Sequence, residues 1–247
     1  MEKSSDRNVS LDEQRQSWNA WNASERETKL PSSARRQATL IEQWVGALGR
    51  TNLEIIDVGC GVGWMCERLV RFGRVVGTDL ADDAIRRARV RLPSALFFSG
   101  DFLQIDLPYG QFDVVITMGV LAHVASQSAF LARIARLLKD SGYLMLSTQN
   151  RPVLESSSEV PGAQAGQLRH WVNARQLRAL LTPEFDDIRI TSVAPGGDQG
   201  WLRIVNSHKL NRLLSFFVPE RWIEALKERA LLGQYLVVRA RKKHGAG

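Results

Sequence analysis

The sequence predicts an α/β fold in which helices cover both faces of a doubly wound, mostly parallel sheet. Short apolar runs alternate with amphipathic segments from residue 53 to residue 150, as they do when each strand is followed by a helix. A glycine-rich loop follows the first apolar run. The chain has 247 residues, of which 44% are hydrophobic, and this suffices for one such domain with additions.

The apolar runs have the length of buried strands, and the segments between them have the spacing of helices. Strands are expected at residues 55–58, 74–78, 96–98, 112–117 and 142–148, and helices at residues 62–72, 82–91 and 126–138. A late run at residues 235–240 is apolar enough to join the same sheet.

The segments outside this core divide the chain into five parts. Residues 1–15 are polar without periodicity and are expected to be disordered. We assign residues 16–52, broken at Pro31, to an N-terminal helical cover, 53–150 to the core, 151–233 to a loop and helices on the substrate side, and 234–247 to the final strand and a basic tail. In the fourth part, helices are expected at 173–181 and at 209–232 with a break at Pro219.

Charge and composition indicate a soluble, cytoplasmic protein. No apolar run reaches the roughly 18 residues of a membrane span, and residues 1–15 lack the apolar stretch of a secretory signal. The net charge is +7, but arginines are spread along the chain, so nucleic acid is not the expected partner. Cys60 and Cys66 form no metal-binding pattern and are expected to be buried, reduced thiols.

The loop at residues 57–63, Asp-Val-Gly-Cys-Gly-Val-Gly, indicates a ligand that approaches the backbone closely. Glycine accepts positive φ and has no side chain to obstruct such an approach. A dinucleotide site would use G-x-G-x-x-G, whereas the spacing here is G-x-G-x-G and Trp64 follows directly. Asp57 suits the cationic amino group of an amino acid moiety. The loop, with Gly59, Gly61 and Gly63, therefore favours S-adenosylmethionine over NAD.

Further candidate residues follow the second, third and fourth strands. Asp79 ends the second strand, where a carboxylate can accept hydrogen bonds from both ribose hydroxyls. Leu80 and Phe102 could pack against adenine, Asp101 could accept its amino group, and Met118 could contact the adenosine. The alternatives are a helix cap for Asp79, an ordinary turn at Asp101 and core packing for Met118.

Residues 54–148 resemble the class I S-adenosylmethionine-dependent methyltransferases. Within them, residues 112–124 (FDVVITMGVLAHV) and 147–151 (STQNR) look like the 3-demethylubiquinone O-methyltransferase branch. The resemblance implies a Rossmann-like, seven-stranded sheet with a reversed last strand, and makes residues 53–150 the cofactor-binding core. It also implies an N-terminal helical cover with an arginine near the methionine carboxylate, for which Arg35 or Arg36 could serve. The branch usually carries Glu before the histidine where this chain has Ala122, so a metal or base role that depends on a carboxylate is not expected at this position, and we assign no metal ligand.

His123 is the first candidate for a general base, because it follows the fourth strand at the edge where an acceptor should lie. A structural histidine that shapes the loop is the alternative. His170 is a second candidate, and Trp171 beside it could be a stacking wall or a core residue. Trp18 and Trp21 could form a lid or pack a helix onto the sheet.

These residues lead to one preferred function and several alternatives. We expect methyl transfer to a small-molecule acceptor, most simply a hydroxyl, by in-line displacement that leaves S-adenosylhomocysteine. A lipid-linked acceptor, protein or RNA is the first alternative, and an NAD-dependent oxidoreductase or a non-catalytic binding module are more distant ones. Residues 209–221 form an apolar strip with basic borders, which could touch a membrane surface or form a buried helix.

Overall fold

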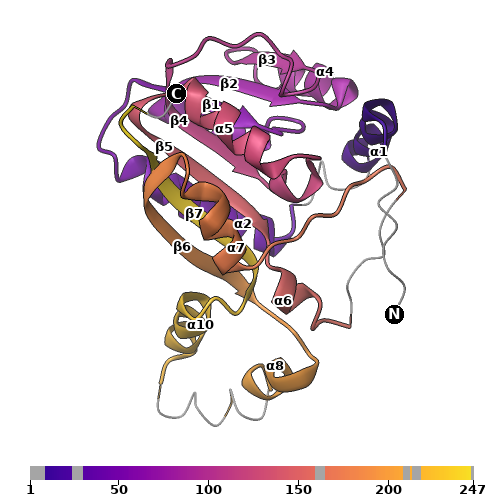
Figure 1. Cartoon of the computed structure of the whole chain (residues 1–247), viewed down its shortest axis with the longest axis vertical. Helices are drawn as coiled ribbons and strands as arrows, with labels where there is room; N and C mark the ends of the chain where they lie inside the picture. The colour runs from indigo at the N-terminus through magenta and orange to yellow at the C-terminus, as the bar shows by residue number, and fades with distance from the viewer. Residues whose placement is uncertain (1–8, 24–29, 159–164, 208–211, 213–217, 246–247) are drawn as a thin grey trace.

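The computed structural model describes residues 9–23, 30–158, 165–207, 212 and 218–245. They contain a seven-stranded sheet with the order β3-β2-β1-β4-β5-β7-β6, in which β7 runs antiparallel to both of its neighbours (Figure 1). The predicted doubly wound sheet with a reversed last strand is therefore confirmed. The strands are β1 (Leu53–Val58), β2 (Gly73–Asp79), β3 (Leu96–Ser99), β4 (Phe112–Met118), β5 (Leu138–Gln149), β6 (Phe185–Pro195) and β7 (Gly233–Lys242).

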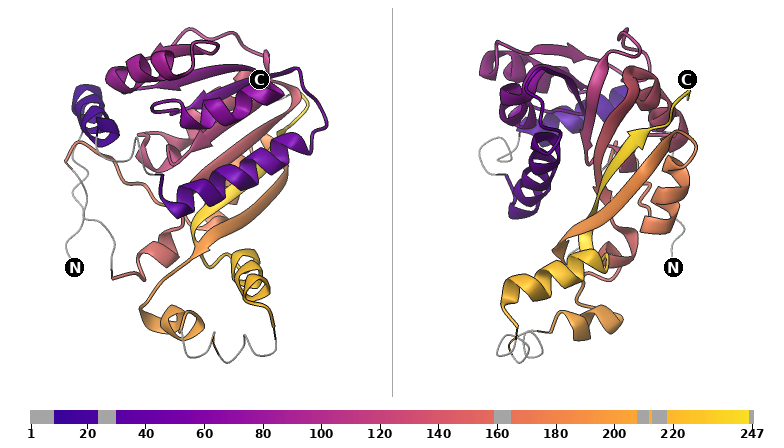
Figure 2. Two further views of the ribbon diagram at one scale, coloured as in Figure 1. Left: turned by 180° about the vertical axis from the view of Figure 1, so that it is seen from behind. Right: turned by 90° about the vertical axis from the view of Figure 1, so that its left-hand side faces the viewer.

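Helices cover the sheet on both faces. Figure 1 views the face that carries α5 (Gln127–Leu137) and α7 (Ala174–Leu181). The left view of Figure 2 shows α2 (Ser32–Gly46) crossing the opposite face, on which α3 (Trp64–Leu69) and α4 (Asp82–Arg91) also pack. The short helix η2 (Val70–Phe72) continues α3, and η3 (Leu121–His123) follows β4.

Two apolar cores result from the alternation of side chains along the central strands. In β4, Val115 belongs to the core under α5 and α7, whereas its neighbour Val114 belongs to the core under α2, α3 and α4. Leu144 and Met145 of β5 divide in the same way. A strand that is covered on both faces needs apolar residues at consecutive positions, which is why these strands read as continuous apolar runs in the sequence.

The N-terminal part begins with α1 (Leu11–Ala23), so the prediction of disorder was wrong for residues 11–15. Ser10 and Glu13 form a capping box, because the Ser10 hydroxyl accepts from the Glu13 amide and the Glu13 carboxylate accepts from the Ser10 amide at 2.8 Å. Asn19 then joins α1 to α4 by donating to Asp82 at 2.8 Å and accepting from the Asp83 amide at 3.2 Å. These bonds fix α1 above the carboxyl end of the sheet.

The C-terminal third adds helices beyond the sheet. They are α6 (Arg151–Leu154), α8 (Gly200–Val205) and α10 (Glu220–Arg229). In Figures 1 and 2, α8 and α10 project past the end of β6 and β7. Arg36 of α2 holds α10 through an ion pair with Glu228 at 2.5 Å. The helix expected at 209–232 is observed from Glu220, and residues 208–211 and 213–217 of that prediction lie outside the described residues.

Among the described residues, no helix combines the length and the apolar character that crossing a bilayer requires.

Candidate functional site

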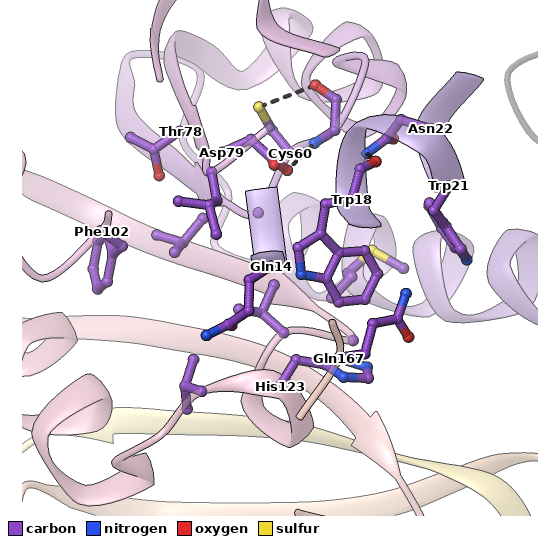
Figure 3. Close-up of a pocket in the computed structure, with 18 of the residues that line it drawn as sticks. Gln14, Trp18, Trp21, Asn22, Cys60, Thr78, Asp79, Phe102, His123 and Gln167 are labelled. Carbon is purple, nitrogen blue, oxygen red and sulfur yellow. Dashed lines mark hydrogen bonds between the residues drawn. The ribbon is translucent and has the colours of Figure 1, made fainter. Parts of the chain in front are cut away.

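A cavity of about 740 Å³ opens at the carboxyl ends of β1, β2 and β4. In parallel sheets this edge gathers the loops that follow each strand, and ligands bind there. Helix α1 covers the cavity, and Figure 3 shows Gln14, Trp18 and Asn22 of α1 facing the loops of the sheet. The cavity therefore brings together side chains from the N-terminal cover and from the predicted core.

The glycine loop after β1 forms one wall of the cavity. Gly59 and Gly61 line it with positive φ angles of 78° and 54°. A Cβ atom at Gly59 would lie 2.1 Å from the Cγ2 atom of Val120, so no other residue fits there without a shift of the next loop. Gly63 is not among the lining residues. It has φ 78° and caps α3, where a Cβ would lie 3.2 Å from the Phe97 ring and 3.3 Å from Ala88.

Asp79 at the end of β2 is held by backbone amides on both carboxylate oxygens. Oδ2 accepts from the Gly61 amide at 2.7 Å, and Oδ1 accepts from the Ala81 amide at 2.8 Å. Burial raises the pKa of this carboxyl group, and the amides oppose that shift. The side chain lines the cavity, and α4 begins without a side-chain cap at Ala81, so Asp79 does not act as the cap of this helix.

Asp57 lines the same wall from the end of β1 but is almost fully buried. Burial raises its pKa to about 7, a hydrogen bond from the Cys66 thiol at 3.5 Å opposes this, and the charge of Asp79 adds to it. Cys60 and Cys66 are both free and buried, as predicted. A cation placed against Asp57 would favour the ionised carboxylate.

The remaining cofactor candidates also line the cavity, namely Leu80, Asp101, Phe102 and Met118. Asp101 accepts from the Leu103 amide at 3.0 Å, which turns the chain after β3. Phe102 meets Phe130 of α5 edge to face, with ring centroids 5.2 Å apart. The turn at Asp101 and the packing of Met118 in the core were the bland alternatives, and both are present together with exposure to the cavity.

His123 faces the cavity from η3. Its Nδ1 atom lies 2.7 Å from the Leu168 carbonyl oxygen, and its ring meets Trp18 edge to face at 4.8 Å. Burial lowers its pKa, so the ring is neutral near pH 7. Because a carbonyl oxygen only accepts, Nδ1 carries the proton and Nε2 is the basic nitrogen.

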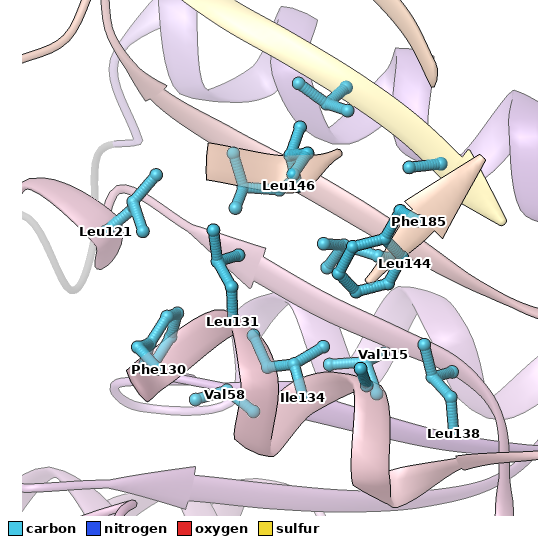
Figure 4. Close-up of a cluster of buried hydrophobic side chains, with 14 of the residues drawn as sticks. Val58, Val115, Leu121, Phe130, Leu131, Ile134, Leu138, Leu144, Leu146 and Phe185 are labelled. Carbon is cyan, nitrogen blue, oxygen red and sulfur yellow. The ribbon is translucent and has the colours of Figure 1, made fainter. Parts of the chain in front are cut away.

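The loop that carries His123 is anchored in the core. Figure 4 shows Leu121 directed into the cluster that contains Phe130 and Leu131. Ala122, at the position where the branch usually carries Glu, is completely buried. The described residues contain no group of three His, Cys, Asp or Glu side chains that could hold a metal ion.

His170 is not among the residues that line the cavity. Its Nδ1 atom lies 3.0 Å from the Val124 carbonyl oxygen, and its amide donates to the Ala122 carbonyl at 2.7 Å. His170 therefore holds the loop after β4, and the neighbouring Trp171 lines the cavity instead.

Neither arginine considered for the methionine carboxylate lines the cavity. Arg36 pairs with Glu228 and Glu224 of α10, and the lining residues of α2 are Ser33, Ala34 and Gln37. Trp18 and Trp21 line the cavity, and Trp18 also packs against Val62, Ala81 and Ala84, so the lid and the packing roles coincide. Sequence reasoning assigned no site role to the polar lining residues Gln14, Asn22, Gln37, Gln149, Gln167 and Arg169, and of these only Gln149 lies in a stretch that the sequence analysis singled out.

Comparison with known proteins shows which proteins this chain resembles. Residues 56–146 match the family model described as a methyltransferase domain. A ubiquinone biosynthesis O-methyltransferase of Rhodopseudomonas palustris (strain BisA53) is 30% identical over 138 residues, which are 53% of this chain and 54% of that protein. Another, from Bartonella quintana (strain Toulouse), is 35% identical over 105 residues, which are 40% and 42%. The chain thus spans about half the length of the curated relatives it matches.

Solved structures share the fold at low sequence identity. The N-methyltransferase NodS from Bradyrhizobium japonicum WM9, in complex with S-adenosylhomocysteine, has a TM-score of 0.65 at 15% identity and covers 94% of this chain and 100% of its own. Phosphoethanolamine N-methyltransferase 2 of Haemonchus contortus, in complex with S-adenosylmethionine, has a TM-score of 0.61 at 16% identity and covers 92% and 56%. Residues 56–146 therefore resemble a methyltransferase domain, and the sheet that contains them has the fold that these methyltransferase structures share.

Proposed function

We propose that this chain transfers the methyl group of S-adenosylmethionine to a hydroxyl group of a small molecule. The observation that carries the proposal is that one cavity of about 740 Å³ contains both the acidic wall formed by Asp57, Asp79 and Asp101 and the imidazole of His123. Small-molecule sites range from about 300 to 1,000 Å³, so this volume suits a cofactor with a compact acceptor. The relatives named as O-methyltransferases support oxygen as the methylated atom.

The residues present fit this cofactor. Gly59 and Gly61 leave open the space that a Cβ would fill, and Asp79 offers a fixed carboxylate to the ribose hydroxyls. Asp57 would pair with the amino group, and Asp101, Phe102, Leu80 and Met118 would surround the adenine. Gly63 does not line the cavity, and its missing side chain leaves room for Phe97 and Ala88 beside the start of α3.

His123 would act as the general base, and the cofactor supplies the electrophile. Bound S-adenosylmethionine provides a methyl group on a cationic sulfur, which becomes the neutral sulfur of S-adenosylhomocysteine when the acceptor oxygen takes the methyl group. His123 Nε2 would receive the hydroxyl proton, since Nδ1 is engaged with the Leu168 carbonyl. A positioned base contributes about 10²–10⁴-fold to such a step. Trp18 and the rest of α1 would exclude water from the reacting atoms.

Calorimetry with S-adenosylhomocysteine and with NAD tests the cofactor assignment. We expect S-adenosylhomocysteine to bind and Asp79→Asn to weaken it about 10- to 100-fold, since hydrogen bonds to a charged group contribute about 1.5–3 kcal/mol. Asp106→Asn is the matched control, because Asp106 is exposed and does not line the cavity. Binding of NAD alone would contradict the proposal, and an unchanged affinity in Asp79→Asn would remove the ribose role of that residue.

We also propose that the region around residues 209–221 contacts an anionic membrane surface, which would bring the protein to a lipid-linked acceptor. Lys209, Leu210, Leu213, Leu214, Phe216 and Phe217 of this segment lie outside the described residues. The helices on either side support the proposal. Trp201 and Ile204 of α8 are 60% and 67% exposed, and Trp222 and Leu226 of α10 are 60% and 69% exposed.

Arg203, Arg221 and Arg229 accompany these exposed apolar side chains on α8 and α10. Apolar side chains with basic neighbours are typical of helices that lie in the membrane interface. Flotation with vesicles of phosphatidylserine and phosphatidylcholine tests this contact. We expect Trp201→Ser combined with Trp222→Ser to abolish co-flotation and Val90→Ser, at an 82% exposed site on α4, to leave it intact. A wild-type protein that stays in the bottom fraction would contradict the proposal.

A further inference from the structure

The segment 167–171 presents alternate side chains to the cavity. Gln167, Arg169 and Trp171 line it. Leu168 and His170, which lie between them, bond to the loop after β4. The Leu168 carbonyl accepts a hydrogen bond from His123 Nδ1, and the His170 amide donates to the Ala122 carbonyl. This alternation is that of an extended chain, in which successive side chains point to opposite sides.

Hydrogen bonds to α5 and to the chain after β5 hold the segment in place. Gln127 of α5 donates to the His170 carbonyl at 2.8 Å. The following residue, Val172, forms a parallel bridge with Asn150 beyond the end of β5 and accepts from the Arg151 amide at 3.0 Å. Arg169 therefore stands at a defined place beside His123 and contributes to lowering the pKa of its imidazole.

The guanidinium of Arg169 is placed over an aromatic face. Its Cζ atom lies 4.6 Å from the ring centroid of Trp171. A guanidinium stacked on an indole has a defined orientation, and its planar set of donors matches the geometry of a carboxylate. Such a fork binds carboxylates through two parallel hydrogen bonds.

Acidic and basic side chains occupy different parts of the carboxyl edge of the sheet. Asp57 and Asp79 lie at the carboxyl ends of β1 and β2, and Asp101 follows β3; these three strands are consecutive in the sheet. Arg169 lies past β4, on the side where β5 ends. Among the described residues that line the cavity, Arg169 is the sole Lys or Arg. The cofactor side is thus acidic and the side of His123 is basic.

We propose that Arg169 binds an anionic group of the methyl acceptor, and that the acceptor is an aromatic hydroxy acid whose ring lies against Trp171. This inference rests on the proposed function. The carboxylate would pair with the guanidinium, and the hydroxyl would then face His123. The aromatic side chains Trp18, Trp21, Trp171 and Tyr235 line the cavity around this position and suit a planar ring.

Matched pairs of neutral and anionic probes test the proposal. The probes are 3,4-dihydroxybenzoate and 4-hydroxybenzoate with their carboxamides, and binding to the protein saturated with S-adenosylhomocysteine is measured by calorimetry. The variants are Arg169→Met and Arg169→Lys. Arg175→Met is the control, because Arg175 on α7 is exposed and does not line the cavity. Binding of S-adenosylhomocysteine is measured first, and its absence would be a failure of the proposed function itself.

We expect wild-type protein to bind the acids at least about tenfold more tightly than the amides, as one charge-assisted fork provides. Arg169→Met should reduce the ratio of acid to amide affinity to near one. Arg169→Lys should retain part of this preference for the acids, and Arg175→Met should retain all of it. A wild-type protein without preference for either acid would overturn the proposal, as would an Arg169→Met variant that keeps the preference.

One further comparison separates the acceptor from the cofactor as the partner of Arg169. Affinity for S-adenosylhomocysteine, which has a carboxylate, is compared with affinity for 5′-methylthioadenosine, which lacks it. We expect Arg169→Met to leave both within about twofold, because the guanidinium pairs with the acceptor. Selective loss of S-adenosylhomocysteine affinity would assign Arg169 to the cofactor carboxylate and overturn the proposal.

Discussion

The carboxyl group of Asp57 determines how cofactor affinity should change with pH. Burial raises its pKa to about 7, against a usual value of 3.8. About one-tenth of the carboxyl groups are then ionised at pH 6 and about nine-tenths at pH 8. If the cationic amino group of the cofactor binds the ionised form, affinity for S-adenosylmethionine should rise about tenfold between these pH values and level off above pH 8.

The raised pKa of Asp57 also predicts how the free energy of unfolding changes with pH in the absence of cofactor. A carboxyl group whose pKa is raised in the folded state contributes stability that is complete below the unfolded pKa and is lost as pH rises through the folded pKa. The window runs from about pH 4 to about pH 7, and three pKa units correspond to about 4 kcal/mol. Asp57→Asn should remove this part of the decline in the free energy of unfolding.

Calorimetry at pH 6 in two buffers of different ionisation enthalpy measures the effect. We expect release of up to about one proton when S-adenosylmethionine binds at pH 6, and none attributable to this site in Asp57→Asn. The charged and titratable neighbours of Asp57 are Cys60, Cys66 and Asp79. His123→Asn is the control for the imidazole of His123, whose pKa is lowered by burial, and it should keep the pH dependence of cofactor affinity. Equal affinities at pH 6 and pH 8 in the wild-type protein would refute this reasoning.

Three substitutions test other parts of the structure. His123→Ala should lower kcat about 10²–10⁴-fold with S-adenosylhomocysteine affinity unchanged, and full turnover would leave His123 a structural role. Gly63→Ala should lower the free energy of unfolding by about 1–3 kcal/mol, because its φ of 78° strains any side chain; urea denaturation that shows no change would contradict this. Asn150→Ala should lower it by about 1–3 kcal/mol, since Asn150 donates to the carbonyls of Leu231 and Gly233; an unshifted melting temperature would count against this.

Local patterns were enough to predict the core of the fold. The helix predicted at residues 82–91 is α4, with the same bounds, and the strands predicted at 55–58, 74–78 and 112–117 lie within β1, β2 and β4. The three strands are neighbours in the sheet, in the order β2-β1-β4, and their apolar runs report their burial directly. Prediction was poorer where tertiary contacts decide. Strand β5 begins at Leu138, which pairs with Phe112 of β4, and residues 139–142 form no apolar run that would mark the strand.

The N-terminal cover shows how a local signal can be overlooked. Residues 1–15 lack apolar periodicity, yet Ser10 and Glu13 have the spacing of a capping box and start α1 at Leu11. Helix α1 is held by Asn19, whose partners at the start of α4 lie 63 and 64 residues away. A bond over that distance leaves no trace in the pattern of a single segment.

The candidate site also contains residues that local sequence patterns predict and residues that only tertiary contacts bring together. The residues expected at the cofactor each follow a strand, and such a position can be read from the strand itself. Arg169 has no such marker, because Gln167, Arg169 and Trp171 have neither shared polarity nor a motif. Their orientation comes from Leu168, which meets His123 across 45 residues, and from the bridge of Val172 to Asn150. His123 and Trp171 could thus be named from the sequence, whereas the place of Gln167 and Arg169 at the proposed acceptor position depends on tertiary contacts.

The separation of acidic and basic residues along the carboxyl edge of the sheet would also affect how tightly the acceptor binds before and after methyl transfer in the proposed complex. Before transfer, the sulfonium and the amino group give the cofactor two positive charges beside Asp57 and Asp79, and an anionic acceptor would be attracted to both the sulfonium and Arg169. With the carboxylate across an aromatic ring from the reacting hydroxyl, the two charges would be about 9 Å apart and would attract by about 2 kcal/mol at an effective dielectric constant of 20. Methyl transfer would neutralise the sulfur, so the attraction between sulfur and acceptor would be lost while the proposed contact with Arg169 would remain. An anionic acceptor would thus be bound more tightly before methyl transfer than after it, which favours formation of the reactive complex over retention of the methylated product.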